Sequence, residues 1–158
     1  LVELVTKEGK SPKTEFVGKS AKYILDKIGI TVGDDVKVIL MEAKEDHPFV
    51  QVELMMPILP VVRVPDVDQA IEMAVRVEHG NRHTAMMHSR NVEKLTKMAK
   101  LIQTTIFVKN GPSYAGIGVG GEGYTTFTIA GPTGEGLTSA KSFARRRRCV
   151  LVGGMDVR

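Results

Sequence analysis

Cysteine, aromatic residues and long apolar runs are scarce in this sequence. It holds one cysteine, Cys149, among 158 residues, so no internal disulfide can form and a reducing compartment is permitted. No apolar run approaches the ~18 residues needed to cross a bilayer, and no secretory signal opens the chain. We therefore expect a cytoplasmic protein without a membrane partner.

The excess of positive charge is small and local. The formal net charge is +4, with 42% hydrophobic and 25% charged residues, as expected for one globular domain with a real core. Four consecutive arginines at 145–148 account for the excess. Such an arginine run could indicate a nucleic-acid partner, because contacts to phosphates dominate the affinity of proteins for nucleic acids. However, four arginines on a strand place two on each face, and no aromatic platform or recognition helix accompanies them. We expect subunit salt bridges and no nucleic-acid partner.

Apolar periodicity predicts an α/β fold. Helical spacing indicates three helices, over residues 17–28, from an N-cap at Asp66 onward, and over 91–103. Extended apolar runs predict strands at 34–43, 57–64, 83–89 and 104–110. Strands and helices that alternate in this way predict crossover units and a mainly parallel sheet covered by helices.

The glycine-rich stretch NGPSYAGIGVGGEGYTTFTIAGPTGEG (110–136) partly matches two phosphate-binding motifs. Gly116, Gly118 and Gly121 fit G-x-G-x-x-G, and a second glycine motif follows with Leu137 in place of the lysine. Such glycines bind phosphate only where they open a helix. The residues after Gly121 are β-branched and aromatic, which favours extended chain. We expect a long loop with a functional or packing role rather than a phosphate site.

Cys149 and the histidines suggest two further sites. Arginines beside Cys149 could activate its thiol as a nucleophile, but the RRCVLVGG context and the absence of a nearby histidine favour a structural cysteine. His79, His83 and His88 have a spacing that suggests zinc. A Gly-Asn pair interrupts any helix between the first two, and no H-E-x-x-H pattern is present. We predict no metal site.

Three long stretches resemble the C-terminal part of the CoA-acylating aldehyde dehydrogenases. They are HPFVQVELMMPILPVVRVPDVDQAIEMAV (47–75), HTAMMHSRN (83–91) and IFVKNGPSYAGIGVGGEGYTTFTIAGPTGEGLTSAKSFARRRRCVLV (106–152). Within this family, the sequence is similar above all to the propionaldehyde and acetaldehyde dehydrogenases of diol and ethanolamine catabolism. The similarity runs from about residue 15 to the end.

The resemblance implies part of an enzyme. Residues 1–137 correspond to part of the catalytic domain, and residues 138–158 to the C-terminal segment whose strand builds oligomers. The family's NAD-binding domain and its nucleophilic cysteine lie upstream of the matched region, so Cys149 is not the nucleophile. Since the chain begins with Leu1 rather than methionine, we expect a boundary inside the catalytic domain.

The implied reaction belongs to the parent enzyme, the longer protein that would contain this chain. In the family, a cysteine thiolate attacks a short-chain aldehyde, hydride passes to NAD, and CoA captures the thioester. The isolated chain is expected to be inactive and to hold neither NAD nor CoA tightly. Enclosure of a cytoplasmic parent within a bacterial microcompartment is left open by the sequence.

Two groups of site residues follow from the resemblance. The family's Glu-x-x-x-Pro element stands here as Glu53 to Pro57, which makes Glu53 the ligand of the nicotinamide ribose. Met55 and Pro57 complete the cofactor-binding group, and without the resemblance Glu53 reads equally well as an exposed strand-edge carboxylate. The loop after residue 109 borders the aldehyde and acyl-transfer pocket, and its candidate lining residues are Asn110, Pro112, Ser113 and Ile117.

Residues 142–152 are predicted to form an intersubunit strand of a homo-oligomer. The segment has a charged first half and an apolar second half, with Arg146 and Arg148 on one face and Arg145 and Arg147 on the other. Such an edge recruits another chain. A different class of function, a free-standing non-catalytic α/β binding or assembly module, remains open from the residues alone.

Overall fold

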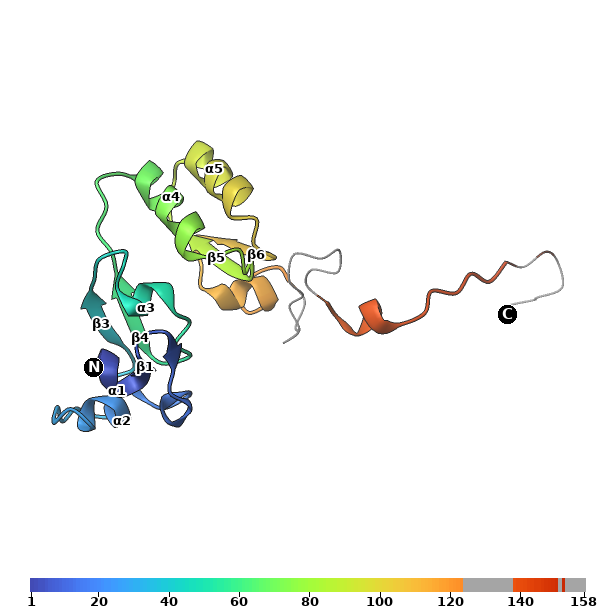
Figure 1. The fold of residues 1–158 in the computed structure, drawn as a ribbon. Helices are drawn as coiled ribbons and strands as arrows, with labels where there is room; N and C mark the ends of the chain where they lie inside the picture. Colours follow the sequence, from blue (N-terminus) through green and yellow to red (C-terminus); the bar gives the residue numbers. More distant parts are fainter. Residues whose placement is uncertain (124–137, 151, 153–158) are drawn as a thin grey trace. The chain divides into compact units, whose positions relative to one another are not determined.

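The computed structural model describes residues 1–123, 138–150 and 152, drawn in colour in Figure 1. The chain divides into two compact units, Leu1–Gly80 and Asn81–Arg158. Unit 1 contains α1 (Val2–Val5), β1 (Thr6–Lys7), β2 (Ser11–Pro12), the 3-10 helix η1 (Thr14–Phe16), α2 (Ala21–Asp26), β3 (Ile39–Glu42), α3 (Pro48–Gln51), β4 (Ile58–Val61) and α4 (Val67–Val77). Unit 2 contains β5 (Thr84–Met87), α5 (Val92–Ile102), β6 (Ile106–Lys109) and the 3-10 helices η2 (Ser113–Ile117) and η3 (Ala140–Phe143).

The expected α/β class and parallel pairing are confirmed. Strands β3 and β4 pair in parallel, with Ile39 opposite Ile58, and β5 and β6 pair in parallel, with Thr84 opposite Ile106. Each pair is joined by a helical crossover, as parallel strands require. The short antiparallel pair β1–β2 and helix α1 were not predicted, because neither carries a clear apolar period.

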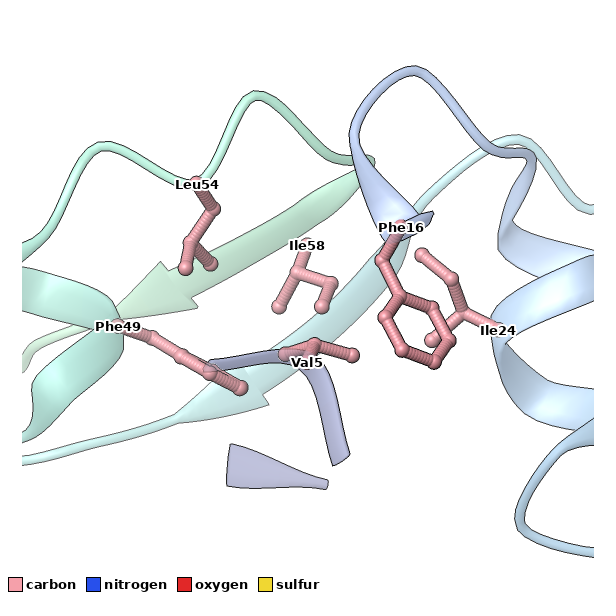
Figure 2. Close-up of a cluster of buried hydrophobic side chains, with 6 residues drawn as sticks. All are labelled: Val5, Phe16, Ile24, Phe49, Leu54 and Ile58. Carbon is pink, nitrogen blue, oxygen red and sulfur yellow. The ribbon is translucent and has the colours of Figure 1, made fainter. Parts of the chain in front are cut away.

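Unit 1 is built on one apolar cluster (Figure 2). Six buried side chains meet there: Val5, Phe16, Ile24, Phe49, Leu54 and Ile58. Ile24 is fully buried, and complete burial of such a side chain contributes about 1.5–3 kcal/mol relative to leaving it exposed. Leu54 belongs to this cluster, so the residues on either side of it are held at the edge of a packed core.

The predicted helix over 17–28 is wrong in its length. Helix α2 occupies only Ala21–Asp26, and Ile28, expected on its buried face, is exposed. Gly18 has φ +72° and breaks the chain before the helix. The Ser20 hydroxyl then accepts a hydrogen bond from the Tyr23 N–H at 3.2 Å and so fixes the start.

Helices α4 and α5 agree with their predicted spans. The Asp66 carboxylate caps α4 by accepting from the Gln69 N–H at 2.9 Å, and this bond lowers the pKa of Asp66. Asn91 caps α5 in the same way, through Oδ1 and the Lys94 N–H at 3.0 Å. Each cap satisfies a backbone donor that the first turn leaves unpaired. A strand is found within each of the four predicted spans, and the structure shortens each to four residues. Strand β3 lies at the C-terminal end of its predicted span, because residues 34–38 form no strand.

The predicted strand over 142–152 is not seen as a strand within the chain. Phe143 lies in η3, and the described residues 144–150 and 152 form no strand with the rest of the described chain. A β-ladder requires a neighbouring strand, and a strand that pairs only with another subunit has no ladder within its own chain. The expected role between subunits therefore stays a prediction.

A two-point ion pair ties the last turn of α4 to the loop before α3. Arg76 Nε lies 2.8 Å from Glu45 Oε1, and Arg76 Nη2 lies 3.1 Å from Glu45 Oε2. The hydrogen bonds from Arg76 lower the pKa of Glu45, and those to Glu45 raise the pKa of Arg76. This geometry is the strong form of an arginine–carboxylate pair.

We expect the stabilisation from this pair to disappear in acid. Because the folded-state pKa of Glu45 lies below the ordinary value of 4.5, its contribution is present above that pH and is lost as pH falls through the folded-state pKa. Arg76→Gln should therefore lower the Tm at pH 7 and leave it unchanged at the acid end of the transition. Thermal unfolding of both proteins across the acid range checks this, and an equal Tm difference at every pH would contradict it.

Candidate functional site

The segment from Glu53 to Pro57 crosses the edge of the unit 1 core. Leu54 is buried, whereas Glu53 is exposed. The Glu53 carboxylate makes no hydrogen bond or ion pair with other residues in the part of the chain that the structure describes. Both of its oxygens are thus available to accept hydrogen bonds from a bound molecule.

Met55 has an unusual backbone conformation. Its φ is +54°, in the left-handed region, and its side chain is 57% exposed. The Met55 carbonyl accepts the Gly18 N–H at 3.1 Å, which fixes the turn against the start of α2. A left-handed methionine is sterically unfavourable, and such residues gather at functional sites.

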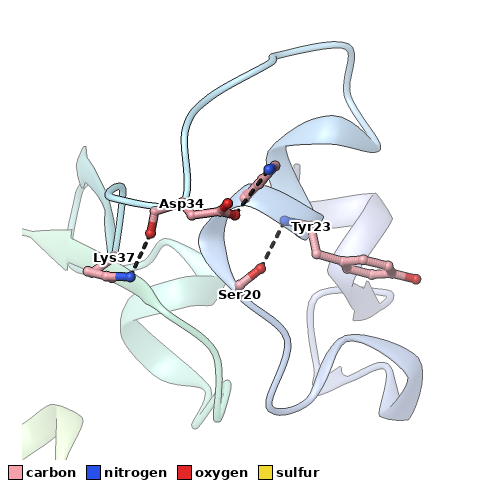
Figure 3. A network of polar contacts seen from close by, with 5 residues as sticks. Ser20, Tyr23, Asp34 and Lys37 are labelled. Carbon is pink, nitrogen blue, oxygen red and sulfur yellow. Dashed lines mark hydrogen bonds and ion pairs between the residues drawn. The ribbon is translucent and has the colours of Figure 1, made fainter.

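Met55 and Pro57 line an open cleft of about 560 Å³ within unit 1. Across it lies the start of α2, with residues 18–22, and the cleft is completed by Asp34, Val36 and Lys37. Lys22 Nζ pairs with Asp34 Oδ1 at 3.0 Å, and Lys37 Nζ donates to the Asp34 carbonyl (Figure 3). The structure thus brings two of the three predicted cofactor residues to one cleft, and Glu53 is not part of its lining.

Asn110 follows β6 directly, in unit 2. Its N–H donates to the Met87 carbonyl at 3.0 Å, which extends the β5–β6 ladder by one residue. Its φ is +54°, so the backbone leaves the ladder there. The side chain continues the pairing, because Oδ1 accepts the Ser89 N–H at 2.7 Å and Nδ2 donates to the Ser89 carbonyl at 2.9 Å. We refer to these two hydrogen bonds as the amide clamp.

The loop after Asn110 folds tightly, and its glycines explain how. A Cβ on Gly116 would collide with Ile106 Cγ2, and one on Gly121 would lie 2.9 Å from the Ala115 carbonyl oxygen. Gly118 has φ +97° and ends η2. No helix begins among the described residues that follow it, up to residue 123. The glycines thus allow close backbone packing of this loop.

The other predicted residues of this loop lie along η2. Pro112 is the exposed residue before the helix, Ser113 is its half-buried first residue, and Ile117 is its half-buried last residue. All of them follow the carboxyl end of β6, and ligands of open parallel sheets bind beyond the carboxyl ends of the strands. The two predicted groups lie in different units.

The alternative sites from the sequence gain no support from the geometry. Cys149 and the arginines at 145–148 are exposed. His83 is exposed and its Nδ1 lies 2.7 Å from the Thr84 hydroxyl. Among the described residues, no group of three or more His, Cys, Asp or Glu side chains is placed to bind a metal ion. None of their helices is long and apolar enough to cross a membrane.

Two features of the site were missed in the sequence. The pairing of Asn110 with Ser89 joins residues 21 positions apart, so only the correct pairing of β5 with β6 reveals it. The left-handed turn at Met55 has no sequence signal, because methionine does not favour that conformation. An asparagine directly after a strand is a usable signal for a left-handed exit.

Parallel strand pairs with helical crossovers, and a glycine-rich loop beyond the end of β6, place this chain in the α/β class. The family model "Aldehyde dehydrogenase family" matches residues 36–135, and the chain belongs to that family.

Two curated relatives show which aldehyde dehydrogenases this chain resembles. The chain is 55% identical over 152 residues to the CoA-propanoylating propanal dehydrogenase of Salmonella typhimurium, covering 96% of this chain and 32% of that protein. It is 52% identical to the acetylating acetaldehyde dehydrogenase of Escherichia coli, covering 99% and 34%. The chain thus spans about a third of the length of these curated relatives.

Solved structures agree in fold. The propionaldehyde dehydrogenase of Rhodopseudomonas palustris, solved with bound CoA and an acylated cysteine, superimposes with a TM-score of 0.88 at 71% identity, over 94% of this chain and 34% of that one. An enzyme of the same name from a Clostridium phytofermentans fucose-utilisation microcompartment gives 0.83 at 53% identity, over 93% and 33%. The recognised resemblance is confirmed.

Proposed function

We propose that this chain is the C-terminal catalytic-domain portion of a CoA-acylating aldehyde dehydrogenase that oxidises a short-chain aldehyde to acyl-CoA. The observation that carries the proposal is 55% identity, across 96% of the chain, to a CoA-propanoylating propanal dehydrogenase. The acetylating and CoA-bound relatives support the same reaction. The parent enzyme would supply the nucleophilic cysteine and the cofactor domain.

The chain's own residues fit a cofactor edge. Glu53 presents an exposed carboxylate without a partner among the described residues, which suits two adjacent ribose hydroxyls. NAD, when bound, supplies the hydride acceptor. Met55 and Pro57, fixed by the Gly18 hydrogen bond, hold the turn beside Glu53. CoA enters the proposal through the relatives alone, and no residue here is given a role in binding it.

The loop after β6 would form one wall of the aldehyde pocket. Ser113 and Ile117 lie on the short helix η2 and Pro112 directly precedes it, and η2 is packed on β6 through Gly116. In this arrangement the wall presents an exposed proline and the half-buried Ser113 and Ile117, small and apolar side chains suited to a short aliphatic aldehyde. The residues would exclude water from the reacting carbon rather than take part in bond making.

An exposed apolar face favours a portion of a longer protein over a free-standing binding module. Leu40 and Leu59 pair across β3 and β4 and are 63% and 53% exposed, and Val61 lies on the same face. Glu42, opposite Val61, is the charged residue on this face. A free-standing domain rarely leaves neighbouring large apolar side chains of this kind in water. The remaining two thirds of the parent would cover it.

The activity of the parent and of this chain tests the proposal. The parent should produce NADH only when an aldehyde, NAD and CoA are all supplied, with acyl-CoA as the product. The 158-residue chain alone should produce none. A parent that turns over no aldehyde would overturn the proposed reaction, and turnover by the isolated chain that Cys149→Ser removes would overturn the assignment of the nucleophile.

Residues 142–152 should carry the assembly of the parent. Deleting residues 142–158 should lower its oligomer mass, because arginine pairs and an apolar strand end would be lost from the subunit contact. Deleting only residues 153–158 is the matched control and should leave the mass unchanged. Light scattering measures both, and an unchanged oligomer after the longer deletion would rule out the bridging role.

A further inference from the structure

Asn110 is tied to the protein through its side-chain amide. Its amide makes two hydrogen bonds to one residue, Ser89, at 2.7 and 2.9 Å. The direction of the amide is fixed, since a backbone N–H only donates and a carbonyl only accepts. Both functional groups of the side chain are therefore engaged at the strand ends.

The amide clamp replaces a missing rung of the ladder. In a regular parallel pair, the Ser89 N–H would bond to the backbone carbonyl of residue 110. The left-handed backbone at Asn110 turns that carbonyl away. Side-chain Oδ1 accepts the Ser89 N–H in its place, so the loop leaves the sheet without leaving this donor unpaired.

The clamp also joins three pieces of structure. Ser89 Oγ accepts the Asn91 N–H at 3.0 Å, and Asn91 caps α5. A single asparagine thus couples the end of β6, the turn after β5 and the start of α5. On the other side of the loop, Gly116 seats η2 directly on Ile106. The wall formed by Pro112, Ser113 and Ile117 is held between these two attachments.

We propose that Asn110 is a positioning residue that sets where this wall lies relative to the aldehyde. The inference rests on the proposed function. Releasing the clamp would let the loop move and enlarge the space for the aldehyde chain, while the nucleophile and the cofactor contact stay in place. Its signature is a change in aldehyde selectivity rather than a uniform loss of activity.

Two substitutions in the parent separate the effect of the clamp's hydrogen bonds from the effect of the left-handed backbone conformation. Asn110→Asp keeps the size but loses the donor to the Ser89 carbonyl. Asn110→Gly accepts the left-handed conformation at no steric cost and removes the clamp entirely. Asn91→Asp, in the turn after β5, is the matched control: it is the same chemical change, and it preserves the acceptor that caps α5.

The readout is kcat and KM for acetaldehyde, propanal and butanal. Both Asn110 variants should lose roughly 10- to 100-fold in kcat/KM for the best aldehyde, because small displacements of a positioning group have effects of that size. The loss should be carried by KM and be smaller for the longest aldehyde. Asn91→Asp should match the wild type in all three.

The outcomes distinguish a failure of the proposed function from a failure of the positioning role of Asn110. A wild-type parent without CoA-dependent aldehyde oxidation would contradict the proposed function itself. An active parent whose Asn110 variants keep the wild-type ratio of kcat/KM among the three aldehydes would overturn the positioning role, whether or not their Tm falls.

Discussion

Replacing Glu53 by glutamine in the parent enzyme should slow hydride transfer by one to two orders of magnitude. The substitution keeps the size of the side chain and removes its charge, so one charge-assisted hydrogen bond to the ribose becomes a neutral one or is lost. Such a bond contributes about 1.5–3 kcal/mol, and each 1.36 kcal/mol corresponds to about tenfold in rate.

The environment of Glu53 allows its role in cofactor binding to be tested without disturbing the fold. Glu53 is exposed and has no partner among the described residues, so its loss should not disturb the fold. Glu72→Gln, an exposed glutamate on α4, is the matched control. Single-turnover NADH formation under saturating NAD measures the step directly. If the Glu53 variant keeps the wild-type rate, Glu53 does not hold the ribose.

The predictability of each element follows from where its determinants lie in the chain. Helices α4 and α5 were predicted because an apolar stripe and an Asx cap, Asp66 or Asn91, lie within a few residues of each other. Residues 17–28 carry the same stripe, but the left-handed Gly18 and the Ser20 cap delay the helix start. Local backbone geometry overrode the periodicity there.

The candidate site was predicted in part, for a similar reason. Family motifs located the two segments, and the structure places Met55 and Pro57 in one cleft. What the sequence could not show is the state of each side chain. Asn110 was expected to line a pocket, which stays a prediction, and the sequence did not show that its amide bonds to Ser89, a contact that depends on the long-range pairing of β5 with β6.

Gly116→Ala should destabilise the parent and disturb the loop after β6. The φ of Gly116 is outside the left-handed region, so an alanine is conformationally acceptable there and only its Cβ matters. That atom would collide with Ile106 Cγ2, and Ile106 is buried. Overpacking of this kind costs about 1–3 kcal/mol, and the strain should move η2 away from β6.

A second substitution identifies the cause. Ile106→Leu removes the Cγ2 branch at nearly constant volume, so Gly116→Ala should cost less in that background than in the wild type. Gly111→Ala is the control on the same loop, because its Cβ would make only ordinary contacts, the nearest being Val108 Cγ1 at 3.4 Å. Urea unfolding midpoints and kcat/KM for propanal give the two readouts. Equal costs for Gly116→Ala in both backgrounds would show that the Ile106 contact does not seat the loop, and the wall of the aldehyde pocket would then depend on the amide clamp alone.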